Sequence, residues 1–196
     1  QEQLSSFFQS VTQLEVLSFI ENSEGDAIRI FQTVNDRGKP LSTMEKTKSL
    51  LIYYSNRYLK GELDEWINES FSNIFEYYDD IKQIGEDIGI NLIRNQNFTE
   101  DNLLRYHFVT FSESDYDPTP AAVLLFLRSK LNELRTDSSQ LSNFISNYTT
   151  GIKLFFANCE EILKLCSTDV FVYKLFVSLG LSATLYPLIV KLKQKN

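Results

Sequence analysis

The chain has 196 residues, of which 43% are hydrophobic and 23% are charged, a composition typical of globular domains. Its formal net charge of -7 means that the surface as a whole repels a phosphate backbone. The single histidine, His107, excludes any metal centre or nuclease site that needs two histidines. With 7 glycines and 4 prolines, the chain also has too few turn formers for a β-sandwich.

The cysteines and the N-terminal residues indicate the cellular compartment. Cys159 and Cys166 are spaced to lie on one helix face, which fits neither a CxxC redox pair nor a zinc site. Residues 1–10 lack the basic and apolar regions of a signal peptide, and no apolar run is long enough to span a membrane. We therefore expect a reduced, cytoplasmic protein without membrane contact. Because the sequence starts at Gln1 without Met, we also expect a fragment of a longer protein.

The N-terminal residues predict a strand, a helix and a loop. Residues 14–20 are rich in apolar and β-branched side chains that partly alternate, which predicts one short strand. Asp26 can cap a helix over residues 27–34. That helix ends in the loop that follows, because Gly38 permits a positive φ and Pro40 cannot continue a helix.

From residue 42 onward the sequence predicts only helices. Ser42 and Glu45 form a capping box, which predicts a helix from there to about Tyr58. Apolar residues then recur at spacings of three and four in a long helix after Gly61, whose end is marked by Gly85 and Gly89. Further helices are predicted to begin near Thr99, Thr119, Ser138 and Asp169, the last being divided or bent by Gly180 and Pro187.

Charge is distributed unevenly along the chain. Residues 60–117 hold 14 acidic and four basic side chains. Residues 27–48 hold five basic and two acidic side chains, so the positive zone coincides with the Gly-Pro loop and the helix after it. A loop that leads into a helix N-terminus is suited to holding an anion.

The segment Ile30–Ser42, which reads IFQTVNDRGKPLS, resembles the IFxxxNxRGxPLS segment of the GmrSD-type family. This family comprises modification-dependent restriction endonucleases and related phage-defence proteins. The strand-like segment before the loop, Glu45–Lys48 and Leu104–His107 are also similar to family members. The resemblance is close over residues 14–58 and looser beyond, where mainly the order of helices matches.

The resemblance implies a multi-domain enzyme that hydrolyses nucleoside triphosphates and cleaves DNA, often DNA with modified bases or phosphorothioates. In the family, a ParB/sulfiredoxin-like domain contains an Asp-Gly-Gln-Gln-Arg motif and a C-terminal domain contains a His- and Asn-containing nuclease centre. Neither is found in this sequence. The chain is thus expected to be the inactive middle of the protein, with no catalytic residue, metal or cofactor of its own. NTP, Mg²⁺ and DNA would be bound by the parent protein, the flanking domains would be partners, and homo-oligomerisation stays open.

The predicted fold class is mainly α and multi-helical, with one short strand near the N-terminus left over from a ParB/sulfiredoxin-like α/β domain. Residues 1–58 are assigned to the C-terminal part of that domain. Residues 59–196 are assigned to a helical domain. A second hypothesis of a different class is a helical protein-interaction module, without catalytic activity, whose acidic face and aromatic grooves bind a protein partner.

The candidate site for a nucleotide or a DNA phosphate consists of Asn35, Arg37, Gly38 and Lys39. Arg37 would bind a phosphate through two parallel hydrogen bonds, assisted by the loop amides. The alternative is that the loop only ends one helix and starts the next. Turn chemistry does not require an arginine at position 37, and both interpretations stay open.

Other candidate residues have simpler explanations. His107 lies on an apolar helix face without a nucleophile beside it, which favours a packed, hydrogen-bonded core histidine over a catalytic one. The acidic residues from Glu62 to Asp80 are expected to form a solvated helix face. Asp80 and Lys82 match a D/E-x-K nuclease element, but that element normally lies on a strand, whereas these residues close a long helix.

Overall fold

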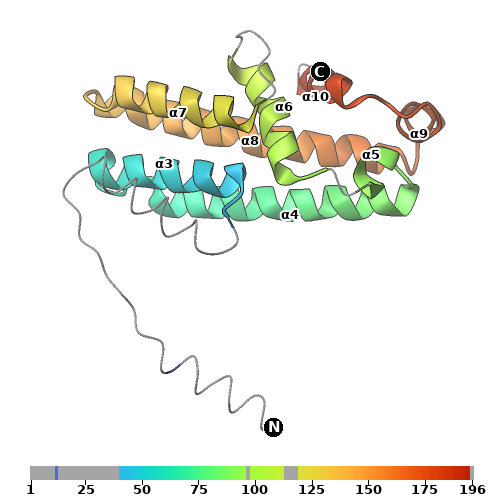
Figure 1. The fold of residues 1–196 in the computed structure, drawn as a ribbon, viewed down its shortest axis with the longest axis horizontal. Coiled ribbons are helices and arrows are strands. Elements are labelled where there is room, and N and C mark those ends of the chain that lie inside the picture. The colour runs from blue at the N-terminus through green and yellow to red at the C-terminus, as the bar shows by residue number, and fades with distance from the viewer. Residues whose placement is uncertain (1–11, 13–39, 96–97, 113–118, 195–196) are drawn as a thin grey trace. The chain divides into compact units, whose positions relative to one another are not determined.

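The computed structural model describes residues 12, 40–95, 98–112 and 119–194. The chain divides into two compact units, residues 1–40 and residues 41–196. The strand predicted at 14–20 and the helix predicted at 27–34 lie outside the described residues. In the second unit the described residues form helices and no strand, which confirms the mainly α prediction (Figure 1).

Two helix pairs form the centre of the second unit. The first pair is α3 (Thr43–Leu59) and α4 (Asp64–Ile88), and the second is α7 (Pro120–Leu134) and α8 (Ser138–Leu165). Within each pair the helices are antiparallel, and the long helices α4 and α8 run in the same direction (Figure 1). The most extensive contact between elements joins α4 to α8, because both have a continuous apolar stripe.

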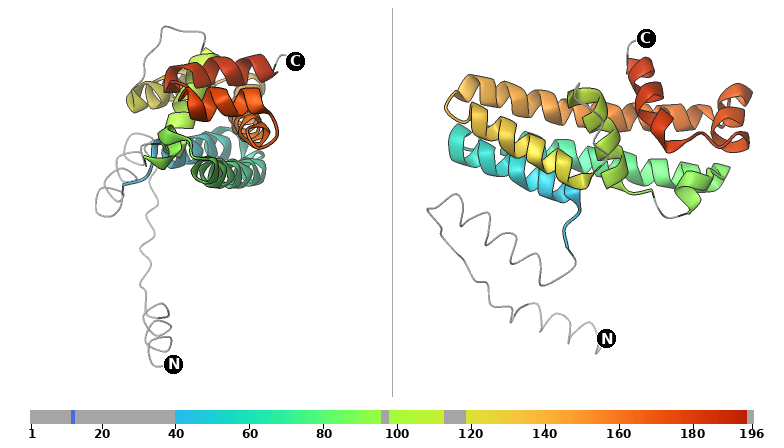
Figure 2. Two further views of the ribbon diagram at one scale, coloured as in Figure 1. Left: turned by 90° about the vertical axis from the view of Figure 1, so that its right-hand side faces the viewer. Right: turned by 45° about the horizontal axis from the view of Figure 1, so that its top comes forward.

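The remaining helices pack around these pairs. The short α5 (Asn91–Arg94) packs on α4, and α6 (Glu100–Ser112) crosses the pairs and contacts α3, α7 and α8 (Figure 2). The C-terminal residues form α9 (Val170–Tyr173), a π-helical turn (Lys174–Ser178), a 3-10 turn (Ala183–Leu185) and α10 (Tyr186–Gln194). Helix α10 packs against α6 and α8.

Most helix ends follow the predicted signals, and the two differences are at Gly85 and Pro187. Gly89 ends α4 in the left-handed conformation, with a φ of 85°. Gly85 instead stays inside α4, where a Cβ atom would overlap the Ile93 side chain, so this glycine permits close packing of α5. Gly180 separates the last helices with a φ of 65°, whereas Pro187 lies in the first turn of α10, where proline is tolerated.

The predicted domain boundary was placed after residue 58, whereas the two units divide after Pro40. Helix α3 packs against α4, α6, α7 and α8, so it belongs to the helical unit. The reason is its apolar face, with Met44 and Leu51 fully buried. A domain boundary predicted from sequence resemblance takes no account of this packing.

Aromatic side chains from four helices form one part of the core. Rings of α6, α7 and α8 meet with centroid separations of 5.0 Å between Phe111 and Tyr148 and 5.3 Å between Phe108 and Phe126. On the other side of α6, Tyr106 and Phe176 pack on Tyr186 of α10. These aromatic residues thus form part of the core.

Candidate functional site

The predicted phosphate-binding residues, Asn35, Arg37, Gly38 and Lys39, lie outside the described residues. The structure does describe the point where their loop enters the helical unit. Pro40 is exposed, and Ser42 caps α3 with the predicted capping box. The Ser42 Oγ accepts a hydrogen bond from the Glu45 amide at 3.2 Å, and the Glu45 carboxylate accepts one from the Ser42 amide at 2.7 Å.

A second carboxylate, from another helix, completes the N-terminus of α3. Asp101 of α6 accepts hydrogen bonds from the Thr43 amide at 2.9 Å and from the Met44 amide at 2.8 Å. With the Glu45 amide bonded to Ser42, the first three amides of α3 are all satisfied. The negative charge also lies at the positive end of the helix dipole, where it is stabilising.

This arrangement changes how the region can bind an anion. The sequence predicted that the N-terminus of α3 is suited to an anion, and in the structure the chain's own Asp101 carboxylate occupies that position. A phosphate at the same amides would have to displace a carboxylate. The predicted anion site therefore cannot use the amides of Thr43, Met44 and Glu45 while these hydrogen bonds are present.

Asp101 is held in place by the first turn of α6. The Asn102 side chain accepts hydrogen bonds from the amide and the hydroxyl of Thr99, at 2.8 and 2.7 Å. The Tyr78 hydroxyl donates to the Phe98 carbonyl at 3.0 Å and so fixes the approach to this turn on α4. Sequence analysis recognised a helix start near Thr99 but not the role of Asp101, because no local pattern marks a cap that acts on a distant helix.

Tyr78 lies close to several carboxylates. Burial, and after it the negative charges of Glu100, Asp79, Glu86 and Asp101, together raise the pKa of its hydroxyl to about 12. The phenol stays protonated and acts as a hydrogen-bond donor. Its role at this position is structural.

His107 is a core residue, as predicted, although it does not have the predicted hydrogen bonding at one nitrogen. Its side chain is 3% exposed and packs against the rings of Phe111 and Tyr148, each with centroids 5.3 Å away. Its Nδ1 atom has no hydrogen-bond partner within the described part of the chain. Its Nε2 atom faces Gly151 of α8, where an added Cβ atom would lie only 2.8 Å away.

The electrostatic environment keeps His107 neutral. Burial, and after it the positive charge of Lys191, together lower the pKa of the imidazole to about 3. A neutral ring enclosed by aromatic side chains is not accessible for general acid-base catalysis of a bound substrate. The structure therefore supports the core assignment of His107.

The acidic residues of α4 are solvated. Glu65, Glu69 and Glu76 are exposed, while Asp64 is half-buried and accepts a hydrogen bond from Asn56 at 3.2 Å. Asp80 and Lys82 are exposed on the same helix, so they do not form a nuclease element on a strand. Within residues 40–95, 98–112 and 119–194, no three His, Cys, Asp or Glu side chains are grouped to hold a metal ion.

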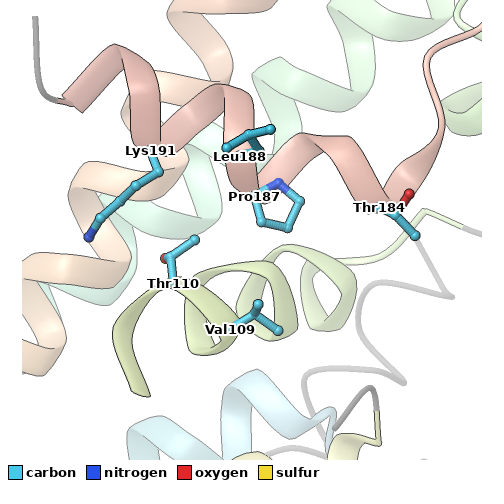
Figure 3. Close-up of a pocket in the computed structure, with 6 residues that line it drawn as sticks. All are labelled: Val109, Thr110, Thr184, Pro187, Leu188 and Lys191. Atoms are coloured by element: carbon cyan, nitrogen blue, oxygen red, sulfur yellow. The ribbon is translucent and has the colours of Figure 1, made fainter. Parts of the chain in front are cut away.

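A groove of about 460 Å³ lies between α6 and α10 (Figure 3). Val109 and Thr110 of α6 form one side, and residues of the 3-10 turn and of α10 form the other. Lys191 lies at one end of the groove and Thr184 at the other (Figure 3). The lining residues are Val109, Thr110, Thr184, Pro187, Leu188 and Lys191. Sequence analysis did not identify this groove, because it forms only where two helices far apart in sequence meet.

The cysteines are buried and not bonded to each other. Burial raises the pKa of the Cys159 thiol to about 12, so it stays protonated and unreactive near neutral pH. None of the described helices is both long and apolar enough to cross a membrane.

In comparisons with known proteins, no family, no curated protein and no solved structure matches the chain.

Proposed function

We propose that the chain is part of a GmrSD-like, NTP-dependent DNA endonuclease that senses modified DNA in phage defence. The observation that supports this proposal is the segment Ile30–Ser42, which resembles the family signature and leads directly into α3. On this proposal the nucleotide motif and the nuclease centre belong to flanking parts of the parent protein. The chain alone is then inactive, because hydrolysis of NTP with Mg²⁺ requires the nucleotide motif of a flanking part.

The role proposed for the helical unit is to hold the end of the signature loop. The loop is followed at once by Ser42, Thr43 and Met44, whose backbone amides are all bonded to carboxylates. This fixes the direction in which the chain leaves the loop. Asn35, Arg37, Gly38 and Lys39 would then contact a nucleotide or a DNA phosphate, with Arg37 as the main contact.

The phosphate contact can be tested by DNA binding. We would measure fluorescence anisotropy of labelled duplexes, with and without modified cytosine, over a series of salt concentrations. Arg37→Ala should weaken binding about tenfold and reduce the slope of log K against log salt by about 1. Lys82→Ala removes the same charge from the exposed face of α4 and is the matched control, expected to change little.

Two results would contradict the proposed contact. One is equal weakening by Arg37→Ala and Lys82→Ala, which would indicate a general charge effect. The other is no salt-sensitive binding by the unsubstituted chain. Thermal unfolding of each variant shows whether Arg37→Ala instead disrupts the fold, the result expected if the loop only connects two helices.

The endonuclease activity proposed for the parent protein is tested separately. Reading the gene on both sides of the region that encodes this chain should reveal an upstream Asp-Gly-Gln-Gln-Arg motif and a downstream His- and Asn-containing nuclease region. Their absence would refute the endonuclease proposal. The chain itself should not hydrolyse GTP or UTP with Mg²⁺, and measured turnover would contradict its proposed inactivity.

The second candidate, a non-catalytic interaction module, is favoured by one feature of the C-terminal region. Large apolar side chains are unusually exposed there, including Phe171 at 75% and Leu179 at 78%. Exposed apolar side chains that gather in one region are typical of interaction surfaces.

A further inference from the structure

The solvent-exposed side of α10 has a stripe of leucines. Leu185, Leu188 and Leu192 are 42%, 56% and 53% exposed. Leu185 ends the 3-10 turn directly before α10, and the spacing of three and then four residues places it in line with Leu188 and Leu192 on one side of α10. Isolated exposed leucines are ordinary, but a stripe at this spacing is typical of a helix that packs against another helix.

The leucine stripe continues into the groove between α6 and α10. Leu188 belongs to both, and Pro187 and Val109 extend the apolar lining (Figure 3). We call the three leucines and the six groove residues together the α10 surface. It runs along the 3-10 turn and α10, residues 183–194, a length of about 18 Å at helical rise.

The one charged side chain among the residues of the α10 surface is Lys191, so the sign of its charge is opposite to that of the chain as a whole. Residues 170–196 contain four lysines and no Asp or Glu, whereas the chain has a net charge of -7. Lys193 is paired with Glu161 of α8 at 3.4 Å. Lys191, at the end of the groove, is exposed and has no carboxylate partner among the described residues. A partner with negative charge beside an apolar stripe would complement this surface.

We propose that the α10 surface binds an acidic amphipathic helix of a partner protein. The apolar stripe of that helix packs on Leu185, Leu188 and Leu192, and a carboxylate next to the stripe pairs with Lys191. A helix of about 12–14 residues matches the length of the surface. This inference is independent of the endonuclease proposal and does not involve the signature loop.

Other occupants fit the same surface less well. Within residues 170–194 there are only three lysines to attract an anionic membrane, and the chain as a whole has a net charge of -7. If two copies paired symmetrically through their α10 surfaces, the lysines of both copies would come close together. Residues 170–196 have no Asp or Glu carboxylate that could pair with them. Helix α4 of a second copy offers carboxylates, but none of the large exposed apolar side chains of the described residues lies on it.

The experiment uses the full chain and three labelled peptides of about 14 residues. Each peptide is held helical and has the same leucine stripe, with glutamates, glutamines or lysines beside it. Fluorescence anisotropy should show the acidic peptide binding at least about tenfold more tightly than the basic one, with an affinity that falls as salt rises.

Substitutions locate the binding. Leu188→Glu should weaken binding of the acidic peptide about tenfold or more, since it puts a charge in the stripe. Leu125→Glu is the matched control, because Leu125 is 65% exposed on α7, and it should leave binding unchanged. Lys191→Glu should reverse the preference, so that the basic peptide binds more tightly than the acidic one.

Four results would overturn the proposal. These are no binding of any peptide, equal binding of all three, equal loss with Leu125→Glu, or no reversal with Lys191→Glu. Sedimentation experiments test the two other occupants, a second copy of the chain and a membrane. Self-association abolished by Leu188→Glu would assign the surface to a second copy, and cosedimentation with phosphatidylserine vesicles abolished by Leu188→Glu would assign it to a membrane. Circular dichroism melting confirms that each variant is folded.

Discussion

Replacing Asp101 by alanine removes the acceptor for two backbone amides at the start of α3. These amides belong to Thr43 and Met44, and the Met44 residue is fully buried. A hydrogen bond to a charged group contributes about 1.5–3 kcal/mol, and the two bonds share one carboxylate, so their contributions do not add fully. The expected loss in the free energy of unfolding is about 3 kcal/mol. Asp101→Asn keeps a neutral oxygen acceptor and should lose about half as much.

Urea unfolding followed by far-UV circular dichroism measures these losses. For a domain of this size, 3 kcal/mol corresponds to a fall in Tm of about 6–12 °C. Glu100→Ala is the matched control, because it removes the same charge from the same turn of α6 without removing a hydrogen bond to α3. If Asp101→Ala costs no more than Glu100→Ala, the carboxylate does not stabilise the start of α3 and the reasoning is refuted.

Three further predictions concern the core. The pKa of His107 is lowered from 6.5 to about 3, so below pH 6.5 the unfolded chain gains a proton that the folded chain does not, and stability falls by up to about 1.4 kcal/mol per pH unit. His107→Leu should remove this pH-dependent loss of stability, measured as the difference in the free energy of unfolding by urea between about pH 7 and about pH 5. The same difference in His107→Leu as in the unsubstituted chain would contradict this prediction. Gly151→Ala brings a Cβ atom to 2.8 Å from His107 Nε2 and should cost about 1–3 kcal/mol in thermal unfolding, whereas Thr150→Ala on the exposed side of α8 should cost little. Tyr78→Phe loses the hydrogen bond to the Phe98 carbonyl and should cost about 1 kcal/mol by urea unfolding; no loss would indicate that this bond is not stabilising.

The helices that sequence analysis located best are those with local end signals. The Ser42 capping box, the Thr119 cap before Pro120 and the left-handed Gly89 all act within a few residues of the helix end they define. The buried stripe of α8 is equally local, since each residue follows from the helical repeat. Such signals are readable in one sequence because no distant partner is needed.

The features that sequence analysis missed depend on distant contacts. Asp101 bonds to amides that are 57 and 58 residues away in the chain. The sequence predicts that Gly85 marks a helix end, but Gly85 lies inside α4, where the absence of a side chain leaves room for Ile93. The groove at Lys191 requires α6 and α10 to meet, and no periodicity in either helix predicts that meeting. Tertiary packing decides all three cases.

The Asp101 carboxylate also limits how the predicted site can work. In the sequence, Arg37 lies shortly before the predicted helix N-terminus at Ser42, which on its own suggests an anion site that uses both the guanidinium and the helix amides. In the structure those amides are already bonded to Asp101 and Ser42, and the added negative charge disfavours a second anion at the same atoms. On the proposed function, a phosphate would have to be held by Arg37, Lys39 and amides before Ser42, because the first three amides of α3 are already bonded to the chain's own side chains.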